Sequence, residues 1–205
     1  MHKEVINKKT ECLLAEIAKT SFIRDFYLAG GTALALQYGH RKSIDLDWFS
    51  PQWFNAVELK GSLVKIGKII IDSEEKNTLN LDLNGVKLSF LNYPYKLIFP
   101  LVDWQGIKLA DHRDIACMKL DAVSSRGSKK DFIDLYFFLQ TGCLSDLMNL
   151  FEKKYKGIKF NKLHILKSLT YFIEADECPM PIMLKDVKWS KVREYFQNIA
   201  KEEVI

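Results

Sequence analysis

Apolar and polar positions alternate along residues 26–93 in short runs whose length and period are typical of β-strands. Outside these runs, apolar residues at helical spacing predict a helix over residues 3–20 and a second over about 52–66, with Pro51 near its first turn. The last two strands are joined through Asn84-Gly85, a strong signal for a hairpin. The predicted strands are "FYLAG" (26–30), "SIDLDWF" (43–49), "KIIID" (68–72), "TLNLDL" (78–83) and "VKLSFLNY" (86–93).

The pattern changes at Asp111, beyond which only helices are predicted. Strands and helices mixed in the first half and helices alone in the second predict an α+β (α/β) domain followed by a helical domain. The domains are expected at residues 1–108 and 109–205. The predicted C-terminal helices span about 111–125, 129–140, 145–155, 161–174 and 189–203.

Composition narrows the class of protein. The 205 residues are 48% hydrophobic and 27% charged, and no apolar run approaches the roughly 18 residues needed to span a bilayer, so we expect a cytoplasmic protein without a membrane partner. Four scattered cysteines predict reduced, partly buried thiols. The net charge of +4 is uneven, because residues 151–173 hold six lysines against the single acid Glu152, an excess that could meet a phosphate backbone. Aromatic residues in this segment are expected in the core rather than stacked on RNA bases: Tyr155, Phe160, Tyr171 and Phe172.

Two aspartates interrupt the apolar strand at residues 43–49. Successive side chains of a strand point to opposite faces, so Asp45 and Asp47 should share one face while Ile44, Leu46 and Trp48 hold the other in the core. Two carboxylates this close repel each other unless a cation compensates, and Mg²⁺ (or Mn²⁺) prefers such oxygen ligands. The pair therefore predicts a divalent metal site.

A Gly-Gly-Thr sequence precedes this strand. Gly30 and Gly31 allow a tight turn with exposed amides, and Thr32 is expected to be the N-cap of the following helix, whose N-terminus favours an anion. A phosphate cradle beside a metal site suits phosphoryl transfer from an NTP. Arg41 and Ser43 could contact phosphate or could cap the turn.

A second group of charged residues lies in the helical half. Lys119 and Arg126 are seven residues apart on one predicted helix, and Asp131 and Asp134 share a face at the start of the next. Lys119 with Asp131, or Arg126 with Asp134, could form ion pairs that pin the two helices together. Beside a metal site, Lys119 could instead stabilise charge on a triphosphate, Asp131 could be a base or could orient Lys119, and Arg126 and Asp134 would support them.

The segments "GGTALALQYGHRKSIDLDWF" (30–49) and "DIACMKLDAVSSRGSKKDFIDLYFFL" (114–139) resemble the signature of the nucleotidyltransferase superfamily, in the form found in the AbiEii/AbiGii abortive-infection toxins of type IV toxin–antitoxin systems. The resemblance implies a nucleotidyltransferase-like mixed sheet followed by a helical bundle. It also implies transfer of NMP from an NTP to an acceptor hydroxyl, with an RNA such as tRNA as acceptor. An antitoxin encoded by the adjacent gene would be the partner, without obligate direct binding.

One position departs from the superfamily pattern. A third carboxylate is commonly supplied by a later strand, but the central residue of "VKLSFLNY" is Ser89, and the nearest acid is Asp82. Two aspartates could suffice, with Asp131 completing the metal or base function. Alternatively, the chain is a nucleotide-binding module with little or no transfer activity. A transferase acting on a small molecule such as an antibiotic is a further alternative.

Overall fold

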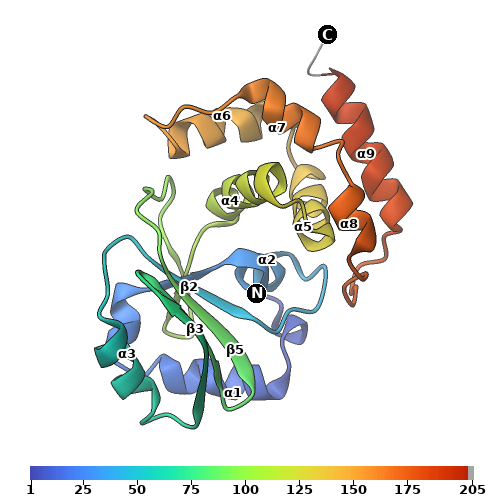
Figure 1. Cartoon of the computed structure of the whole chain (residues 1–205). Coiled ribbons are helices and arrows are strands. Elements are labelled where there is room, and N and C mark those ends of the chain that lie inside the picture. The colour runs from blue at the N-terminus through green and yellow to red at the C-terminus, as the bar shows by residue number, and fades with distance from the viewer. Residues whose placement is uncertain (203–205) are drawn as a thin grey trace.

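A mixed seven-stranded sheet forms the first half of the computed structural model, which describes residues 1–202 (Figure 1). Its strand order is β3-β4-β5-β2-β1-β7-β6. Helices alone follow the sheet, so the α+β class expected from the sequence is confirmed. The strands are β1 (Tyr27–Ala29), β2 (Leu46–Ser50), β3 (Ile69–Glu75), β4 (Thr78–Leu83), β5 (Val86–Asn92), β6 (Val102–Trp104) and β7 (Ile107–Leu109).

Strand β2 occupies the middle of the sheet. It runs antiparallel to β1 and parallel to β5, in a register that places Asp47 opposite Ala29 on one side and opposite Ser89 on the other. The hairpin predicted at Asn84-Gly85 joins β4 to β5, and both turn residues have positive φ. The sheet therefore carries Asp47 at its centre, beside the strand that was searched for a third acid.

One face of the sheet is packed against helices. Leu79, Leu81 and Leu83 of β4 are fully buried, whereas the residues between them are partly exposed. This alternation follows the period of a strand with one face in the core. Helices α1 (Lys8–Ile17) and α3 (Ala56–Leu63) contribute their apolar residues to the same hydrophobic cluster.

The second half packs around its own hydrophobic cluster, above the sheet in Figure 1. The two clusters meet within helix α4, where Ile115 belongs to the first and Ala116 to the second. The predicted division at residues 108 and 109 stays a prediction. The remaining helices are α2 (Gly30–Tyr38), α4 (His112–Ser125), α5 (Lys129–Leu139), α6 (Leu144–Lys154), α7 (Lys162–Ser168), α8 (Ile173–Glu177) and α9 (Trp189–Glu202), and 3-10 turns lie at Lys3–Val5 and Phe22–Asp25.

Several predicted helix bounds were wrong. The helix expected over 3–20 begins only at Lys8, because Asn7 is extended and its side chain caps α1 by accepting from the Thr10 amide. Likewise, Asn55 caps α3, so the helix expected over 52–66 begins at Ala56. The helix expected over 161–174 is broken into α7 and α8. Residue 203 of the last predicted helix lies outside the described residues.

The strand expected over 43–49 begins only at Leu46. Leu46 and Trp48 are buried as predicted, but Ile44 is 57% exposed, because residues 42–45 form an irregular segment in which strand alternation does not apply. Asp45 therefore reaches the ligand side from a loop rather than from the strand.

Helix α2 begins at Gly30 rather than at Thr32. Gly30 has a φ of +66°, a conformation that glycine adopts without steric cost, and it turns the chain from β1 directly into the helix. Ala29 is the N-cap, so the prediction that Thr32 caps the helix was wrong. None of the helices within residues 1–202 is long and apolar enough to cross a membrane.

The four cysteines are free thiols, as predicted, but only Cys117 is buried and Cys178 is partly buried. Cys12 and Cys143 are exposed, which differs from the expected partial burial.

Candidate active site

A pocket of about 480 Å³ lies between the sheet and the helical half. It gathers most of the residues singled out in the sequence, although they come from segments far apart in the chain. Gly30 and Asp134 stand directly behind its wall, in contact with lining residues. The lining residues are Gly31, Thr32, Arg41, Ser43, Asp45, Asp47, Lys119, Arg126, Ser128, Lys130, Asp131, Cys178 and Pro179.

Asp45 and Asp47 lie together on the sheet side of this pocket. Burial raises the pKa of Asp47 above its ordinary value of 3.8, and the neighbouring Asp45 raises it further, although Lys119 acts in the opposite direction. The ionised form of Asp47 is therefore incompletely compensated by the protein. A bound cation would supply the missing compensation.

Gly30 and Gly31 leave room for charged side chains of the site, in addition to allowing the turn into α2. A side chain at Gly30 would clash with the Asp47 carboxylate, and one at Gly31 would clash with the guanidinium of Arg41. Thr32 is fully buried, and its hydroxyl contacts the Ser43 hydroxyl at 2.8 Å and the backbone oxygen of Asp45. The start of α2 is thus tied to the loop that carries the first aspartate.

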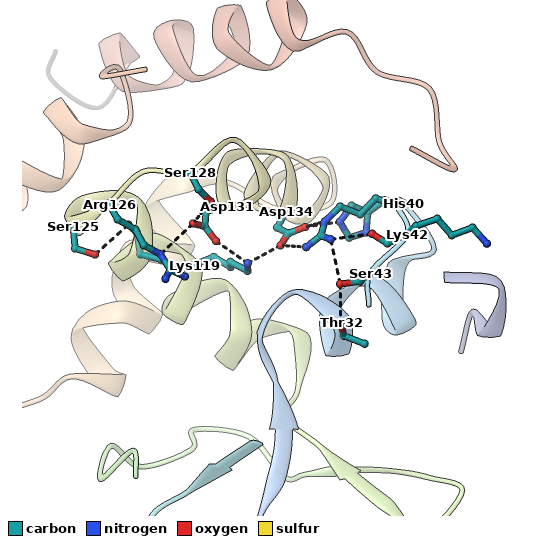
Figure 2. A network of polar contacts seen from close by, with 12 residues as sticks. Thr32, His40, Lys42, Ser43, Lys119, Ser125, Arg126, Ser128, Asp131 and Asp134 are labelled. Carbon is teal, nitrogen blue, oxygen red and sulfur yellow. Dashed lines mark hydrogen bonds and ion pairs between the residues drawn. The ribbon is translucent and has the colours of Figure 1, made fainter. Parts of the chain in front are cut away.

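Asp134 is the centre of a buried polar network (Figure 2). Its carboxylate accepts two hydrogen bonds from Arg41, at 2.7 and 2.8 Å, and lies 2.7 Å from both Lys119 Nζ and His40 Nε2. Although burial alone would raise its pKa, Arg41 and Lys119 outweigh that effect and hold the pKa of Asp134 well below its ordinary value. Asp134 is therefore ionised and joins the two halves of the molecule.

Lys119 bridges Asp134 to Asp131, with a distance of 2.7 Å to each carboxylate (Figure 2). Asp131 also accepts a hydrogen bond of 2.6 Å from Ser128 and lies 3.7 Å from Arg126, whose side chain is 73% exposed. Burial would raise the pKa of Asp131, but Lys119 and Ser128 together lower it. The ion pair of Lys119 with Asp131 exists, whereas the suggested pair of Arg126 with Asp134 does not.

Neither position considered for a third carboxylate supplies one to this pocket. Ser89 lies level with Asp47 on the adjacent strand, where the sequence places no acid. Asp82 pairs with Lys87, and its carboxylate accepts a hydrogen bond from the Gly85 amide, so it stabilises the hairpin turn. Asp82 is therefore a turn residue rather than a site residue.

Some residues of the site were missed from the sequence. His40 is fully buried, where burial lowers its pKa and its Nε2–H donates to Asp134 in the neutral form. Lys130 was not singled out and lines the pocket beside Asp131. The position of Lys130 directly before Asp131 in the sequence was the one signal that could have identified it.

A loop after α8 also closes one side of the pocket. Cys178 and Pro179 line it, and the Cys178 carbonyl accepts a hydrogen bond from Lys129. Further along the loop, Met183 pairs with Arg41 as an isolated antiparallel bridge. Nothing in the sequence of this loop indicated that it would contact the Arg41 segment.

The residues present fit a hard divalent cation that keeps most of its own water. No group of three or more His, Cys, Asp or Glu side chains in residues 1–202 could hold a metal ion by itself. Mg²⁺ commonly binds through one or two carboxylates and completes its shell with water and substrate phosphates. Asp45 and Asp47 match that donor set, and the raised pKa of Asp47 marks where positive charge is lacking.

The Gly31→Ala substitution should destabilise the protein by about 1–3 kcal/mol, because the new methyl group would push Arg41 away from Asp134. Urea unfolding followed by circular dichroism measures this loss. Gly61→Ala is the matched control, since a side chain there meets no atom within 4 Å and the site is helical. We expect the control to raise stability by about 0.5–1 kcal/mol, and an equal response of both variants would contradict the crowding at Gly31.

Comparison with known proteins agrees with this arrangement. The sequence profile described as "Nucleotidyl transferase AbiEii toxin, Type IV TA system" matches residues 12–202. An uncharacterized protein of Aquifex aeolicus is 37% identical over an alignment that covers 96% of this chain and 97% of that protein.

Solved structures show the same fold at low sequence identity. JHP933 from Helicobacter pylori is 17% identical, with a TM-score of 0.56 over 96% of this chain and 92% of that one. MenT4, described as a nucleotidyltransferase toxin from Mycobacterium tuberculosis, is 12% identical, with a TM-score of 0.53 over 96% of this chain and 86% of that one.

Proposed function

The chain belongs to the family of AbiEii nucleotidyl transferase toxins of type IV toxin–antitoxin systems, and on that premise we propose that it transfers NMP from an NTP to an acceptor hydroxyl. One observation carries the proposal. Asp45 and Asp47 line the same pocket as Gly31, which lies in the first turn of α2, and as the positively charged Lys119. A carboxylate pair, free helix amides and fixed positive charge are the parts that phosphoryl transfer requires.

Each part has a role in the proposed reaction. Asp45 and Asp47 would hold Mg²⁺ or Mn²⁺, which supplies positive charge to the phosphates when it is bound. Amides of Gly30, Gly31 and Thr32 at the start of α2 would position the triphosphate. The acceptor hydroxyl attacks the α-phosphorus in line, and pyrophosphate leaves. Arg41, Ser43 and Arg126 also line this pocket and would add contacts to the nucleotide.

We assign Asp131 the task of orienting Lys119 rather than that of a general base. A base works best when its pKa lies near the working pH, but Lys119 and Ser128 lower the pKa of Asp131. Held between Asp131 and Asp134, the ammonium of Lys119 has one fixed position from which to stabilise charge that develops on the phosphates. Asp134 acts on the site indirectly, by positioning Lys119 and Arg41.

An RNA such as tRNA is the proposed acceptor, and growth arrest relieved by an adjacent-gene antitoxin is the proposed role. The family provides the role. The net positive charge of the chain favours a polyanionic acceptor over an antibiotic or another small molecule. In this proposal the antitoxin need not bind the toxin directly.

A second candidate function is nucleotide binding with little transfer. It is favoured by Ser89, which lies beside Asp47 where a third carboxylate would complete the metal site. The two functions differ in product formation and not in NTP binding.

The test is incubation of the full chain with each of the four NTPs, labelled at the α-phosphate, with Mg²⁺ or Mn²⁺ and total RNA. We expect one NTP to label RNA in the presence of metal. Asp45→Asn should abolish the label, whereas Asp72→Asn, which removes an exposed acid from the edge strand β3, should not.

Ser89→Asp separates the two functions. Nucleotide binding without transfer is supported as the function of the wild type if the wild type binds NTP without forming product and Ser89→Asp gains transferase activity. Absence of metal-dependent product from both proteins would contradict the transferase.

A further inference from the structure

A second pocket adjoins the candidate active site, between the end of α4 and helix α7. It has a volume of about 340 Å³, which is enough for one nucleotide unit. Arg126, the C-cap residue of α4, lines both this α4–α7 pocket and the catalytic pocket. A strand bound in one pocket could therefore continue directly into the other.

Tyr171 places an exposed aromatic ring in the lining of this pocket. Its side chain is 56% exposed, whereas the adjacent Phe172 is only 5% exposed and packs in the core. The prediction that both would be core residues was therefore wrong for Tyr171. Among residues 1–202, no side-chain hydrogen bond or ring contact involves Tyr171, so its ring is free to stack on a base.

Two basic residues line the same pocket as this ring. Arg126 is paired only loosely, at 3.7 Å from Asp131, and Lys167 forms no ion pair with the described part of the chain. Within residues 1–202, Glu174 is the single carboxylate that lines the pocket. A phosphate would meet two cations here, while Glu174 could accept from the amino group of a base.

The remaining wall is held in a fixed position. His164 Nε2 donates to the Ser124 carbonyl at 3.0 Å and so joins α7 to the end of α4. Ser168 donates to the His164 carbonyl at 2.9 Å.

The lysines before α7 differ in their exposure. Lys156 and Lys159 are both exposed, whereas Lys154 forms a buried ion pair with Asp114. Of the lysines in residues 151–173, some therefore stabilise the fold, and others are exposed and could contact a polyanion.

We propose that the α4–α7 pocket binds a nucleotide of the acceptor RNA next to its reacting end. The inference rests on the proposed nucleotidyl transfer and adds the place where the acceptor is held. The base stacks on Tyr171, the backbone phosphate lies between Arg126 and Lys167, and the strand passes Arg126 to bring its terminal hydroxyl to the catalytic pocket. The site selects a single-stranded RNA end, because a base within a duplex cannot stack on a protein ring.

Tyr171→Ala in the full chain tests the stacking. Binding of labelled, unfractionated tRNA is measured without NTP, so that the result does not depend on turnover, and the KM values for RNA and NTP are measured separately. We expect RNA affinity to fall about 5- to 100-fold with unchanged NTP affinity, while Tyr171→Phe retains wild-type binding. Trp53→Ala, which removes an aromatic residue that is 65% exposed on the sheet half, is the control and should bind RNA as the wild type does.

Lys167→Ala tests the phosphate contact. It should reduce the slope of log affinity against log salt by about 0.7, the value for one phosphate on a single strand, and Lys19→Ala should leave the slope unchanged. The pocket assignment is overturned if Tyr171→Ala leaves RNA affinity unchanged, or if it weakens NTP binding instead, which would identify a donor-base pocket. Failure of the wild type to transfer any label would contradict the proposed function, whereas the binding measurement would still decide the pocket.

Discussion

Asp47→Asn is expected to lower the rate of nucleotidyl transfer by at least about 10³-fold, because it would remove a charged ligand from the proposed two-carboxylate metal site. The same substitution should raise the free energy of unfolding at pH 7 in metal-free buffer. Burial raises the pKa of Asp47, so its ionised form is less stable in the folded chain than in the unfolded one. Loss of activity with gain of stability separates a functional residue from a structural one.

The pH dependence of that gain has a definite sign. A carboxyl group whose folded pKa is raised costs stability at pH values above that pKa, and the cost disappears as pH falls below the unfolded value of 3.8. The difference in melting temperature between Asp47→Asn and the wild type should therefore be largest near pH 7 and shrink on acidification. An Asp47→Asn protein that is less stable than the wild type at pH 7 would contradict this account. Mg²⁺ should reduce the difference by stabilising the wild type alone.

Asp134→Ala is expected to destabilise the protein by about 3–5 kcal/mol, the cost of leaving buried charge without its partner. Arg41 and Lys119, whose side chains are only 3% and 10% exposed, would both lose a carboxylate at 2.7–2.8 Å. Because the pKa of Asp134 is held well below 3.8, its contribution is fully present at neutral pH and is lost only as pH falls through the folded pKa. Urea unfolding gives the loss as a lower midpoint at unchanged slope.

Asp103→Ala is the matched control for Asp134. It breaks the exposed ion pair with Lys108, whose distance of 2.9 Å is comparable, and should change stability far less than Asp134→Ala does. A loss below about 1 kcal/mol for Asp134→Ala would show that Arg41 and Lys119 find other partners. Asp134→Asn should lie between Asp134→Ala and the wild type, because the amide oxygen can still accept from Arg41.

The glycine turn and the aspartate pair could be predicted from the sequence, whereas the exact start of the strand beside them could not. The spacing of Gly30 and Gly31 from Asp45 and Asp47 is local, and strand alternation correctly places Leu46 and Trp48 in the core. The same rule fails for Ile44, because it assumes that the strand already runs through that position. Side-chain alternation follows from backbone geometry and does not itself show where a strand begins.

The buried network could not be predicted in the same way. Asp134 bonds to Arg41 and His40, which are 93 and 94 residues away along the chain, and no periodicity relates such positions. Charge alone suggested pairs between neighbouring helices, which is correct for Lys119 with Asp131. It was wrong for Arg126, whose partner is Asp131 rather than Asp134. Tertiary packing decides among partners that are equivalent by charge.

The loop after α8 fixes the width of the cleft at one end. The Lys42 amide donates to the Ile182 carbonyl at 2.8 Å, and the Leu184 amide donates to the His40 carbonyl at 2.9 Å. Separation of the two halves at this end would break these bonds together with the buried pair of Arg41 and Asp134, so hinge opening there is strongly opposed. Exchange of substrate and product would then depend on the exposed side chains that line the pocket, such as those of Arg126 and Lys130, which can move without unfolding any helix.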